Sequence, residues 1–429
     1  MARDRVIVGI DVGTNKIAIL IGTAPLEGEV NIIGVSTVPS RGLRKGQVVD
    51  IEEATGVITE CLEAAERMAG YSVAAAFVSV GGNHIASQNS HGVVAVAEPE
   101  KEITPLDVDR VIEAAKAISL PSSREILHVL PRGFIVDSQE GIKDPIGMTG
   151  VRLEVDTHLI TGGSTALRNL AKCVSEIGVD VEGLVFGGLA SAEAVVSETE
   201  KELGVVLIDI GGGTTDICLY VEGSLAYSSV IPIGAKNITN DLAIGLRVSL
   251  ESAEKIKLAL GEKPREVVTA EEKEEKEEKD EIDLSYLGLA EEVRKVSKKT
   301  LTEGIIKPRL NEIFTMVSLE IKKSGFAGLT PGGVVLAGGG ALTVGAAEAA
   351  KRNLAMPVRI GIPANITGLV DEILTPSFAT AIGLLLYGAK GTTRGERKVS
   401  LASFGRLIDK IPVKTAAGRV IDLIKSFLP

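Results

Sequence analysis

Apolar residues follow two spacings along the chain, and segments of the two kinds alternate. Short β-branched runs predict strands at residues 6–10, 17–21 and 30–38. In residues 51–68 the apolar positions recur every three or four residues, which predicts a helix, and residues 74–80 predict a further strand. A strand meander followed by a crossover helix is typical of an α/β domain.

A block between residues 82 and 159 interrupts this order. Its predicted elements are a hairpin around Gly92, a helix that begins at Pro105 with Thr104 as its N-cap and ends before Pro121, and two strands at 126–130 and 133–137. A short strand at 159–161 and a helix at 164–177 then return to the earlier order. We interpret the block as a small α/β subdomain inserted into the first domain.

The second half of the chain repeats the order of the first. After a strand–turn–strand sequence its predicted elements are helices at 237–243 and 250–260, the latter capped by Ser249 and ended by Gly261, a helix at 300–323, a strand at 333–337, a helix from Thr343, and a helix at 377–387. One pattern in both halves predicts two lobes. The charged stretch 262–283 has no apolar face, so we expect a solvated loop or a surface helix there.

Two similar sequences lie at corresponding places in the two halves: VGIDVGTNK at residues 8–16 and VLIDIGGGTTD at 206–216. In each, an apolar strand ends in an aspartate and turns on glycine beside a threonine. Glycine lets anionic oxygens approach backbone N–H groups, and an aspartate at a strand end can hold a hydrated cation. One such turn suits any hairpin. Together with a third glycine loop, at 338–340, the pair predicts a nucleotide gripped from two sides.

Length and composition support two lobes and argue against nucleic acid as a partner. The chain has 429 residues, 45% of them apolar, which is enough for more than one hydrophobic core. It contains no Trp, and only 3% of its residues are aromatic, so base-stacking surfaces are scarce. The net charge is −11, whereas a protein that binds phosphate backbones normally has a basic face. Eight acidic residues and three lysines in 271–281 contribute −5 of that charge.

Signals for metal binding, secretion and membrane spanning are absent from the body of the chain. Its three cysteines, Cys61, Cys173 and Cys218, share no metal or redox spacing, and the four histidines do not cluster. The first apolar run is short and is interrupted by Asp11, and no run reaches the ~20 apolar residues that a membrane span requires. We expect a soluble body in a reducing cytosol, with no structural metal.

The C-terminal residues follow an amphipathic pattern. In 412–429 the residues fall on an apolar and a polar helical arc, and 401–411 shows the same spacing upstream of Pro412. One alternative is a helix docked on the body. We favour an interfacial helix that inserts apolar residues among acyl chains while Arg and Lys meet anionic headgroups. The residues expected in the membrane are Phe404, Leu407, Ile408, Val420, Ile421, Ile424, Phe427 and Leu428.

The three glycine loops, in this order, resemble the phosphate-1, phosphate-2 and adenosine motifs of the actin, sugar-kinase and heat-shock-chaperone superfamily. Within it, the chain resembles the FtsA family of bacterial cell-division actin homologues over nearly its full length. The segments that carry this resemblance are 31–35, 40–42, 128–131, 139–143, Gly147, 150–152, 188–191, 359–361 and 365–369. The resemblance implies an α/β, actin-like (ribonuclease H-like) two-lobed fold with an inserted 1C subdomain.

The same resemblance divides the chain into subdomains. The matching ranges are 1–82, 160–199 and 377–390 for subdomain 1A; 83–159 for 1C; 200–235 and 301–376 for 2A; 236–300 for 2B with the acidic loop 262–283; 391–400 for a linker; and 401–429 for the amphipathic membrane-targeting tail. The acidic run is not part of the family pattern. We expect it to shield or tune the 2B surface.

The resemblance also implies ATP with Mg²⁺ between the lobes. The residues at matching positions are Asp11, Gly13, Thr14, Asn15, Lys16, Asp209, Gly211, Gly212, Gly213, Thr214, Thr215, Glu254, Lys257, Gly338, Gly339 and Gly340. Amides and hydroxyls would bond phosphate oxygens, Lys16 would add charge, and Asp11 and Asp209 would bond Mg²⁺-bound waters. Glu254 and Lys257, three apart on one helical face, match the adenosine-side pair of the superfamily; the alternative is a surface ion pair.

One departure from the superfamily concerns catalysis. Filament and chaperone members carry a Glu or Gln, just before a small-residue helix, that orients the attacking water, and the matching position here is Gly188. Glu193 lies on the same helix, but five residues on it should point elsewhere. Because placing the water is a large part of phosphoryl transfer, we expect slow ATPase activity or none, and assign no catalytic residue.

The resemblance implies a role in cell division. FtsA proteins polymerise, tether filaments of the tubulin-like protein FtsZ to the cytoplasmic side of the cell membrane at the division site, and help recruit later divisome proteins. We therefore expect a peripheral membrane protein with FtsZ, further copies of itself and divisome membrane proteins as partners. In the family the C-terminal peptide of FtsZ binds subdomain 2B. Candidate residues for its acidic groups are Lys295, Lys298, Lys299 and Arg309.

Two alternatives fit parts of the sequence. A pilus-assembly actin homologue also has a 1C-like subdomain and binds a peptide from a membrane partner, but it is expected to lack the C-terminal anchor. A sugar or small-molecule kinase needs an aspartate general base and a substrate pocket. The sequence shows no signature of such a base or of such a pocket, and Gly188 argues against efficient phosphoryl transfer.

Overall fold

The apolar runs at the start of the chain form the centre of a six-stranded sheet. Strands β1 (Arg5–Val12), β2 (Lys16–Ala24) and β3 (Val30–Pro39) are antiparallel, as the predicted meander requires. Helix α1 (Ile51–Ala69) then crosses to β6 (Ala75–Val80), which runs parallel to β1. The predicted crossover is therefore confirmed.

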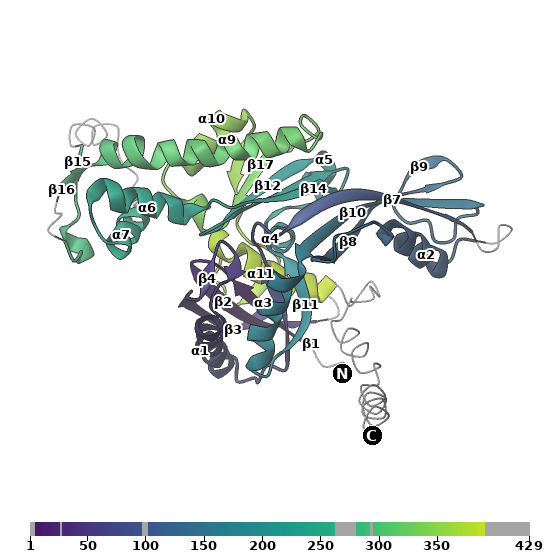
Figure 1. Cartoon of the computed structure of the whole chain (residues 1–429), viewed down its shortest axis with the longest axis horizontal. Helices are drawn as coiled ribbons and strands as arrows, with labels where there is room; N and C mark the ends of the chain where they lie inside the picture. The colour runs from purple at the N-terminus through teal and green to yellow at the C-terminus, as the bar shows by residue number, and fades with distance from the viewer. Residues whose placement is uncertain (1–4, 26–27, 97–101, 262–279, 292–294, 391–429) are drawn as a thin grey trace, which may run out of the picture.

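The computed structural model describes most of the chain (Figure 1). The described ranges are 5–25, 28–96, 102–261, 280–291 and 295–390. The predicted linker, the amphipathic tail and most of the acidic loop lie outside them. Among the described residues, no helix has the length and apolar character needed to cross a membrane.

The second lobe repeats the topology of the first. Its sheet has the order β14-β13-β12-β17-β18, which corresponds to β3-β2-β1-β6-β11 in the first sheet. The strands not yet given are β11 (Asp180–Phe186), β12 (Val205–Ile210), β13 (Thr215–Val221), β14 (Ser224–Ile231), β17 (Val334–Ala337) and β18 (Val358–Ile360). The first sheet also gains β19 (Ile366–Gly368) beside β3. This strand comes from a segment whose predicted subdomain is 2A.

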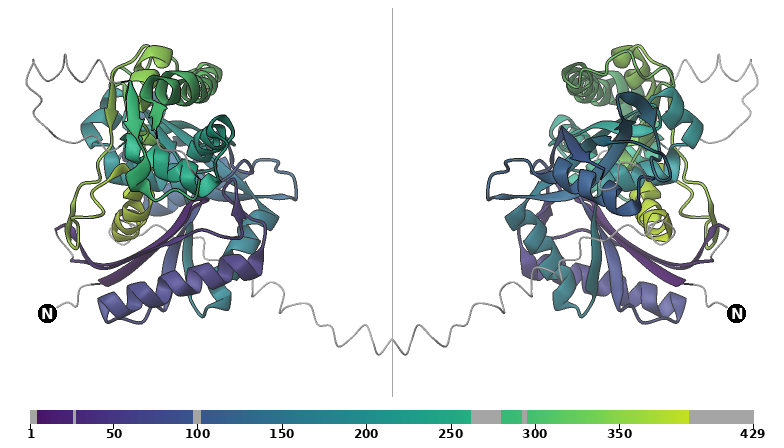
Figure 2. Two further views of the ribbon diagram at one scale, coloured as in Figure 1. Left: turned by 90° about the vertical axis from the view of Figure 1, so that its left-hand side faces the viewer. Right: turned by 90° about the vertical axis from the view of Figure 1, so that its right-hand side faces the viewer.

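Two apolar helices lie between the sheets, α4 (Gly187–Val195) and α11 (Ala379–Lys390). They cross in close contact, because a methyl group at Gly383 would overlap the carbonyl oxygen of Ala190. In Figure 2, α11 lies between the purple strands of the first lobe and the green second lobe. Each lobe has its own hydrophobic core, and both helices contribute to that of the first.

The predicted inserted block forms an arm with a four-stranded sheet of order β7-β10-β8-β9 (Figure 1). Its elements are β7 (Ala86–Ala95), α2 (Pro105–Lys116), β8 (Arg124–Val136), β9 (Gln139–Ile142) and β10 (Arg152–Gly163). Helix α2 starts at the predicted cap, where Thr104 and Asp107 form a capping box. Strand β10 continues through the predicted boundary at residue 159 into the first lobe.

Two predictions inside the arm are wrong. The expected hairpin at Gly92 is an unbroken strand; Gly92 is required because a methyl group there would lie 2.5 Å from the carbonyl oxygen of Val111 in α2. The two expected strands around Pro131 are the single strand β8. Pro131 has no N–H, and the ladder with β10 shifts its register beside it, so the missing donor is tolerated.

The outer part of the second lobe is mainly helical. Its elements are α6 (Ala235–Leu246), α7 (Leu250–Gly261), β15 (Glu281–Asp283), β16 (Lys295–Ser297), a π-helical segment (Thr300–Ile306), α9 (Lys307–Lys323), a 3₁₀ turn (Gly339–Leu342) and α10 (Ala346–Leu354). The hydroxyl of Ser249 accepts from the amide of Ser252, so the predicted cap of α7 is confirmed.

The helix expected at 300–323 has these bounds, but it is π-helical up to Ile306 and α-helical only from Lys307, because Pro308 cannot donate to the carbonyl of residue 304. Two other predicted boundaries in this region are wrong. The helix expected from Thr343 begins at Ala346, after the 3₁₀ turn. The last residues of the charged stretch form strand β15, which pairs with β16.

Candidate nucleotide site

The two predicted phosphate loops are the turns of the hairpins β1–β2 and β12–β13. They face each other across the lobes, since a methyl group on Gly212 would lie 3.0 Å from Cβ of Asn15. A methyl group on Gly213 would lie 2.9 Å from Oγ1 of Thr14. The fold therefore brings together the two sequence copies, from opposite halves of the chain.

The aspartates of both hairpins gather at the ends of these strands. Asp209 and Asp216 are buried and directly opposite each other in the β12–β13 ladder. Burial raises the pKa of Asp209 to about 6, and the charge of Asp11 adds to the shift. Burial, with the charges of Asp209 and Asp11, raises the pKa of Asp216 well above its usual value. The three carboxylates destabilise one another's ionised forms.

One atom of this group has no hydrogen-bond partner among the described residues, the buried Oδ1 of Asp216. A buried carboxylate oxygen without a donor is costly, and a nearby cation or its water would compensate it. The carboxylate of Asp11, by contrast, accepts from the hydroxyl of Ser79 at 2.8 Å. Burial raises the pKa of Asp11, while this hydrogen bond and the charge of Lys16 oppose the shift.

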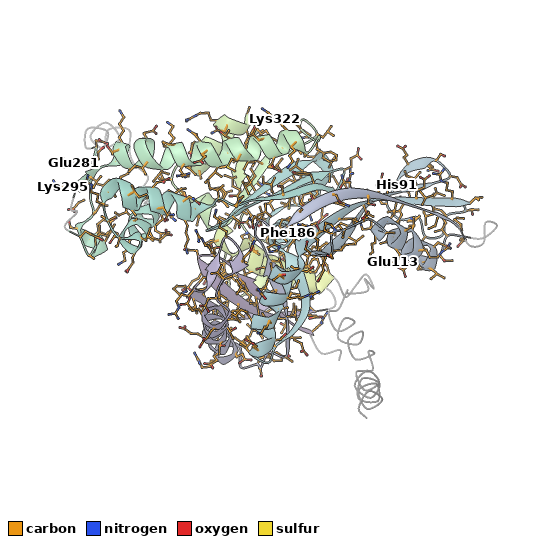
Figure 3. All side chains as sticks on the ribbon, viewed as in Figure 1. His91, Glu113, Phe186, Glu281, Lys295 and Lys322 are labelled. Atoms are coloured by element: carbon orange, nitrogen blue, oxygen red, sulfur yellow. The ribbon has the colours of Figure 1, made fainter. Side chains whose placement is uncertain are left out.

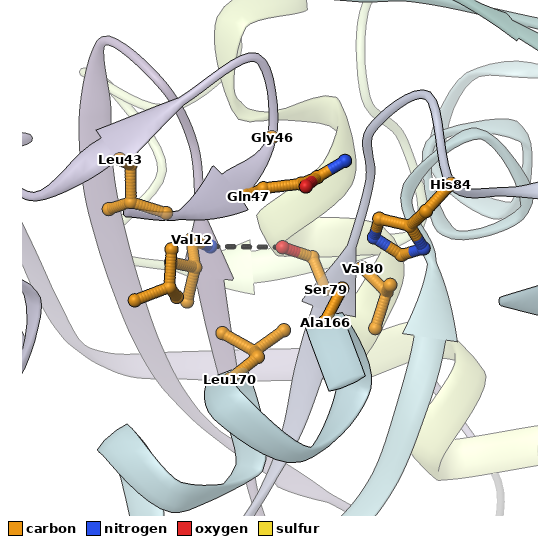
Figure 4. A pocket seen from close by; sticks show the side chains of 10 residues that line it. Val12, Leu43, Gly46, Gln47, Ser79, Val80, His84, Ala166 and Leu170 are labelled. Atoms are coloured by element: carbon orange, nitrogen blue, oxygen red, sulfur yellow. Dashed lines mark hydrogen bonds between the residues drawn. The ribbon is translucent and has the colours of Figure 1, made fainter. Parts of the chain in front are cut away.

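Three residues that sequence reasoning missed support the hairpins. The hydroxyl of Ser79, at the end of β6, also accepts from the amide of Val12 at 2.9 Å (Figure 4). Thr380, in the first turn of α11, donates to the carboxylate of Asp209 at 3.2 Å. Lys236, at the start of α6, donates from Nζ to the carbonyl oxygen of Thr14 at 2.9 Å. Each is a single polar residue at the end of an apolar element, and the sequence offers no other sign that it supports a hairpin.

The pocket in Figure 4 lies beneath the first hairpin, next to Ser79 and His84. Its volume is about 10 Å³, which is the space of a single water molecule. The loop carrying Gly46 covers it, and the amide of Gly46 donates to Oγ1 of Thr14 at 2.9 Å. The hydrogen bond from Gly46 stabilises the first phosphate loop. The pocket itself is too small for a nucleotide.

The side chain of Lys16 lies next to the residues that directly precede helix α11. Its ammonium is 3.5 Å from the ring centroid of Phe378 and donates to the hydroxyl of Ser377 at 3.4 Å. Burial lowers the pKa of Lys16, and the charge of Asp11 opposes that shift. Lys16 therefore places a cation near Asp11 in the first hairpin, and its role as a phosphate ligand stays a prediction.

The predicted adenosine residues lie on the second lobe. Gly338 has φ +77°, and a methyl group there would overlap the carboxylate of Asp209. Lys257 is buried and donates to Glu254 at 2.7 Å and to Thr239 at 2.9 Å. The alternative of a surface ion pair is therefore wrong for Lys257, because its charge is held inside the lobe.

The candidates for an acidic peptide in 2B divide into paired and exposed residues. Arg309 donates to both carboxylate oxygens of Asp241, at 2.6 and 2.9 Å, and also pairs with Glu312. Lys295 pairs with Glu281 at 3.6 Å, and Figure 3 shows both side chains at the tip of this region. Lys298 and Lys299 are exposed. They are the more accessible cations of the predicted set.

Two family models match the chain. The model described as "SHS2 domain inserted in FTSA" matches residues 82–161, and the model "Cell division protein FtsA" matches 206–383. A relative from Pseudomonas aeruginosa, "Cell division protein FtsA", is 40% identical over 410 residues, which are 95% of each chain. The chain belongs to the FtsA family. It is a cell-division protein, and the predicted family is confirmed.

Solved structures show the actin-like fold of this FtsA chain. The "PilM-PilN type IV pilus biogenesis complex" superposes with a TM-score of 0.63 at 16% identity, covering 89% of this chain and 98% of that one. MreB5 of Spiroplasma citri bound to ADP has a TM-score of 0.52 at 14% identity, covering 92% and 99%. The predicted two-lobed fold with an inserted domain is confirmed. The likeness to the pilus protein is one of fold.

The position predicted for a water-orienting side chain in this FtsA chain needs correction. A methyl group on Gly188 would point into the core, 2.9 Å from both the sulfur of Cys218 and the ring of Phe186. A methyl group on Gly187 would instead lie 3.1 Å from the carboxylate of Asp216. Gly187, one residue earlier, is therefore the position that faces the acidic group. Both positions are glycine, so neither supplies a polar side chain.

Glu193 on the same helix is used elsewhere. It pairs with Lys201 and with Lys390 at the end of α11. Its carboxylate is thus committed to the junction between α4, α11 and α5 (Glu198–Leu203). The expectation that it points away from the phosphate loops is confirmed.

Proposed function

We propose that this FtsA-family chain is an ATP-binding tether that links FtsZ filaments to the cytoplasmic side of the cell membrane. The observation that carries the proposal is the meeting of the two phosphate hairpins over three aspartates, one of which has a buried oxygen without a partner among the described residues. Family membership supports the division role, and the amphipathic pattern of 401–429 supports membrane attachment. ATP would then set the geometry of the two lobes.

The residues of both hairpins fit ATP and Mg²⁺. The glycine turns carry no side chains that would keep a phosphate from the backbone, Lys16 is a cation near Asp11, and the loop at Gly338 leaves no room for a side chain. Among the described residues, no cluster of three or more side chains is arranged to bind a metal by itself. We infer that Asp11 and Asp209 hold Mg²⁺ through water, with phosphate completing its shell. The ion would neutralise charge on the phosphates.

We infer that hydrolysis is slow, because Gly187 and Gly188 place no side chain to orient water. Single-turnover hydrolysis with the purified full chain tests this. We expect turnover far below about one per second, a typical lower limit for enzymes. Turnover near that value, abolished by Asp209→Ala, would contradict the inference. Gly187→Glu is the informative gain-of-function variant, since its side chain would face Asp216.

We propose that the FtsZ C-terminal peptide binds the face of 2B that carries Lys298 and Lys299. An open pocket of about 270 Å³ lies nearby in the same subdomain region, lined by Asp241, Gly304, Ile305, Pro308, Arg309 and Glu312. The π-helical segment 300–306 connects the two lysines to this pocket. Arg309 would have to exchange Asp241 for a peptide carboxylate, so we expect it to shape the pocket more than to supply free charge.

Fluorescence anisotropy with the cognate FtsZ C-terminal peptide tests this surface. We expect the pair Lys298→Glu and Lys299→Glu to weaken binding by about tenfold or more, as charge reversal at an interface does. The pair Lys322→Glu and Lys323→Glu, at the far end of α9, is the matched control and should bind as the wild type does. Equal affinities for all three proteins would refute the assignment.

We propose that residues 401–429 anchor the protein and that filament assembly multiplies this weak attachment. Liposome flotation with anionic vesicles compares the full chain with a chain ending at Lys390. This end point keeps α11 and its ion pair to Glu193 intact. If the shortened protein still floats, the tail is not the anchor. We also propose that the protein self-assembles and helps recruit later divisome proteins. Its subdomains would have the ranges predicted from the sequence.

A further inference from the structure

Lys236 contacts both phosphate loops. It is the second residue of α6, and its amide donates to the carbonyl oxygen of Gly212 in the second loop at 2.9 Å. Its ammonium reaches across to the first lobe and donates to the carbonyl oxygen of Thr14 at 2.9 Å. One residue therefore joins the two hairpins at the point where they meet, through its amide on one side and its ammonium on the other.

The charge of Lys236 is poorly compensated. Burial lowers its pKa; the charge of Glu254 opposes the shift, and that of Lys257 adds to it. Within the described ranges, Lys257 forms an ion pair with Glu254 at 2.7 Å, whereas Lys236 forms none. The acceptor of the Lys236 ammonium is thus a neutral carbonyl. A half-buried ammonium gains more from an anionic acceptor than from a neutral one.

We propose that Lys236 is a phosphate-binding residue, whose ammonium leaves the Thr14 carbonyl for an oxygen of the bound triphosphate. This inference rests on the proposed ATP site. It explains why a cation without a carboxylate partner lies between two glycine turns. It also makes lobe closure depend on nucleotide, because the helix that carries Lys236 belongs to one lobe and the loop it touches to the other.

The competing interpretation is a purely structural link between the lobes. In that case, removal of the ammonium would disturb lobe packing, and every ligand of the site would lose affinity to the same extent. A phosphate contact predicts a different result: the loss depends on the phosphates that the ligand carries. Adenosine, which has none, separates the two interpretations.

The test uses Lys236→Met in the full chain, with affinities for MgATP, MgADP and adenosine measured by calorimetry or competition. We expect ATP affinity to fall by about tenfold or more, the usual loss for a hydrogen bond to a charged group, while adenosine affinity stays the same. Lys236→Arg should retain most of the ATP affinity. Lys255→Met is the matched control, because Lys255 lies on α7 and pairs with Glu251 at 3.0 Å.

Two results would overturn the inference. One is ATP affinity of Lys236→Met within about twofold of the wild type, which is smaller than any charged hydrogen bond would give. The other is an equal loss for adenosine and ATP in a variant whose thermal unfolding matches the wild type. If the wild-type protein itself binds no ATP, the proposed function fails instead, so the two failures are distinguishable.

Discussion

The two phosphate hairpins are near copies in sequence, but they differ in electrostatics. In β1–β2 the residue opposite Asp11 is the small, buried Ala18. In β12–β13 the residue opposite Asp209 is a second carboxylate, Asp216. Like charges directly opposite each other destabilise a strand pair. The second hairpin therefore carries a cost that the first does not.

Their surroundings increase the difference. Asp11 accepts from Ser79 and lies near the cation of Lys16, so the first hairpin is compensated within the protein. Asp209 accepts from Thr380, but Oδ1 of Asp216 has no partner among the described residues. The two copies of the motif therefore differ in how their carboxylates are compensated. Asp11 of the first copy has a hydroxyl donor and a nearby cation, whereas the second copy keeps a buried carboxylate oxygen without a donor among the described residues.

The largest expected effect comes from making the first hairpin resemble the second. Ala18→Asp places a buried carboxylate beside Asp11 with no donor, and we expect it to lower the free energy of unfolding by about 3–5 kcal/mol. Urea denaturation of the protein without nucleotide measures this. Ala18→Asn is the neutral control and should cost less. Equal losses would show that side-chain volume, and not charge, distinguishes the hairpins.

A change of pH should have a smaller effect on the free energy of unfolding. The pKa of Asp209 is about 6 in the fold and 3.8 in the unfolded chain, so the folded state retains a proton that the unfolded state has lost. Through Asp209 alone, the free energy of unfolding of the nucleotide-free protein should therefore fall by up to about 3 kcal/mol as pH rises from about 4 to about 6, and Asp216, whose pKa is raised well above its usual value, should extend the fall to higher pH.

Asp209→Asn should remove the Asp209 contribution to this dependence, and the difference between the variant and the wild type measures that contribution. Asp11→Asn should remove less, because the Ser79 hydrogen bond and the charge of Lys16 stabilise ionised Asp11. Chemical denaturation across this pH range measures all three proteins. A larger change for Asp11→Asn than for Asp209→Asn would reverse the comparison.

The smallest expected effect comes from relieving the second hairpin. Asp216→Asn removes a buried, unpartnered carboxylate, and we expect it to stabilise the nucleotide-free protein by about 1–2 kcal/mol. The same change should reduce the additional stabilisation that MgATP gives. Thermal unfolding with and without MgATP measures both quantities. Destabilisation of the nucleotide-free protein would mean that the fold already compensates Asp216.

Much of the site was predictable because its residues stand in local patterns. An apolar strand ending in Asp and followed by Gly and Thr predicts both hairpins, and Thr104 followed by Pro105 predicts the start of α2. Ser79, Thr380 and Lys236 were not predictable. Each contacts a hairpin from an element far away in sequence, and its own neighbours along the chain give no sign of it.

The wrong predictions share a physical cause. Gly92 and Pro131 are turn residues by local preference, yet one lies where α2 packs on β7 and the other at a register shift in β8. Gly187 and Gly188 are adjacent in sequence, so they differ only in the direction in which a side chain would point. The local conformational preference of a residue does not tell where a neighbouring element packs or in which direction a Cα–Cβ bond points.

Sequence patterns alone were enough for most of the strands and helices, for the repetition that makes two lobes, and for the three glycine loops, because these depend on periodicity and on residues close in the chain. The tertiary structure decided which charges meet. It placed Asp216 against Asp209 in a buried ladder, left one oxygen of Asp216 without a donor, and brought Lys236 to Thr14 across the lobes. Charge compensation depends on distance and burial, and both are fixed only when the strands and the two lobes have packed together.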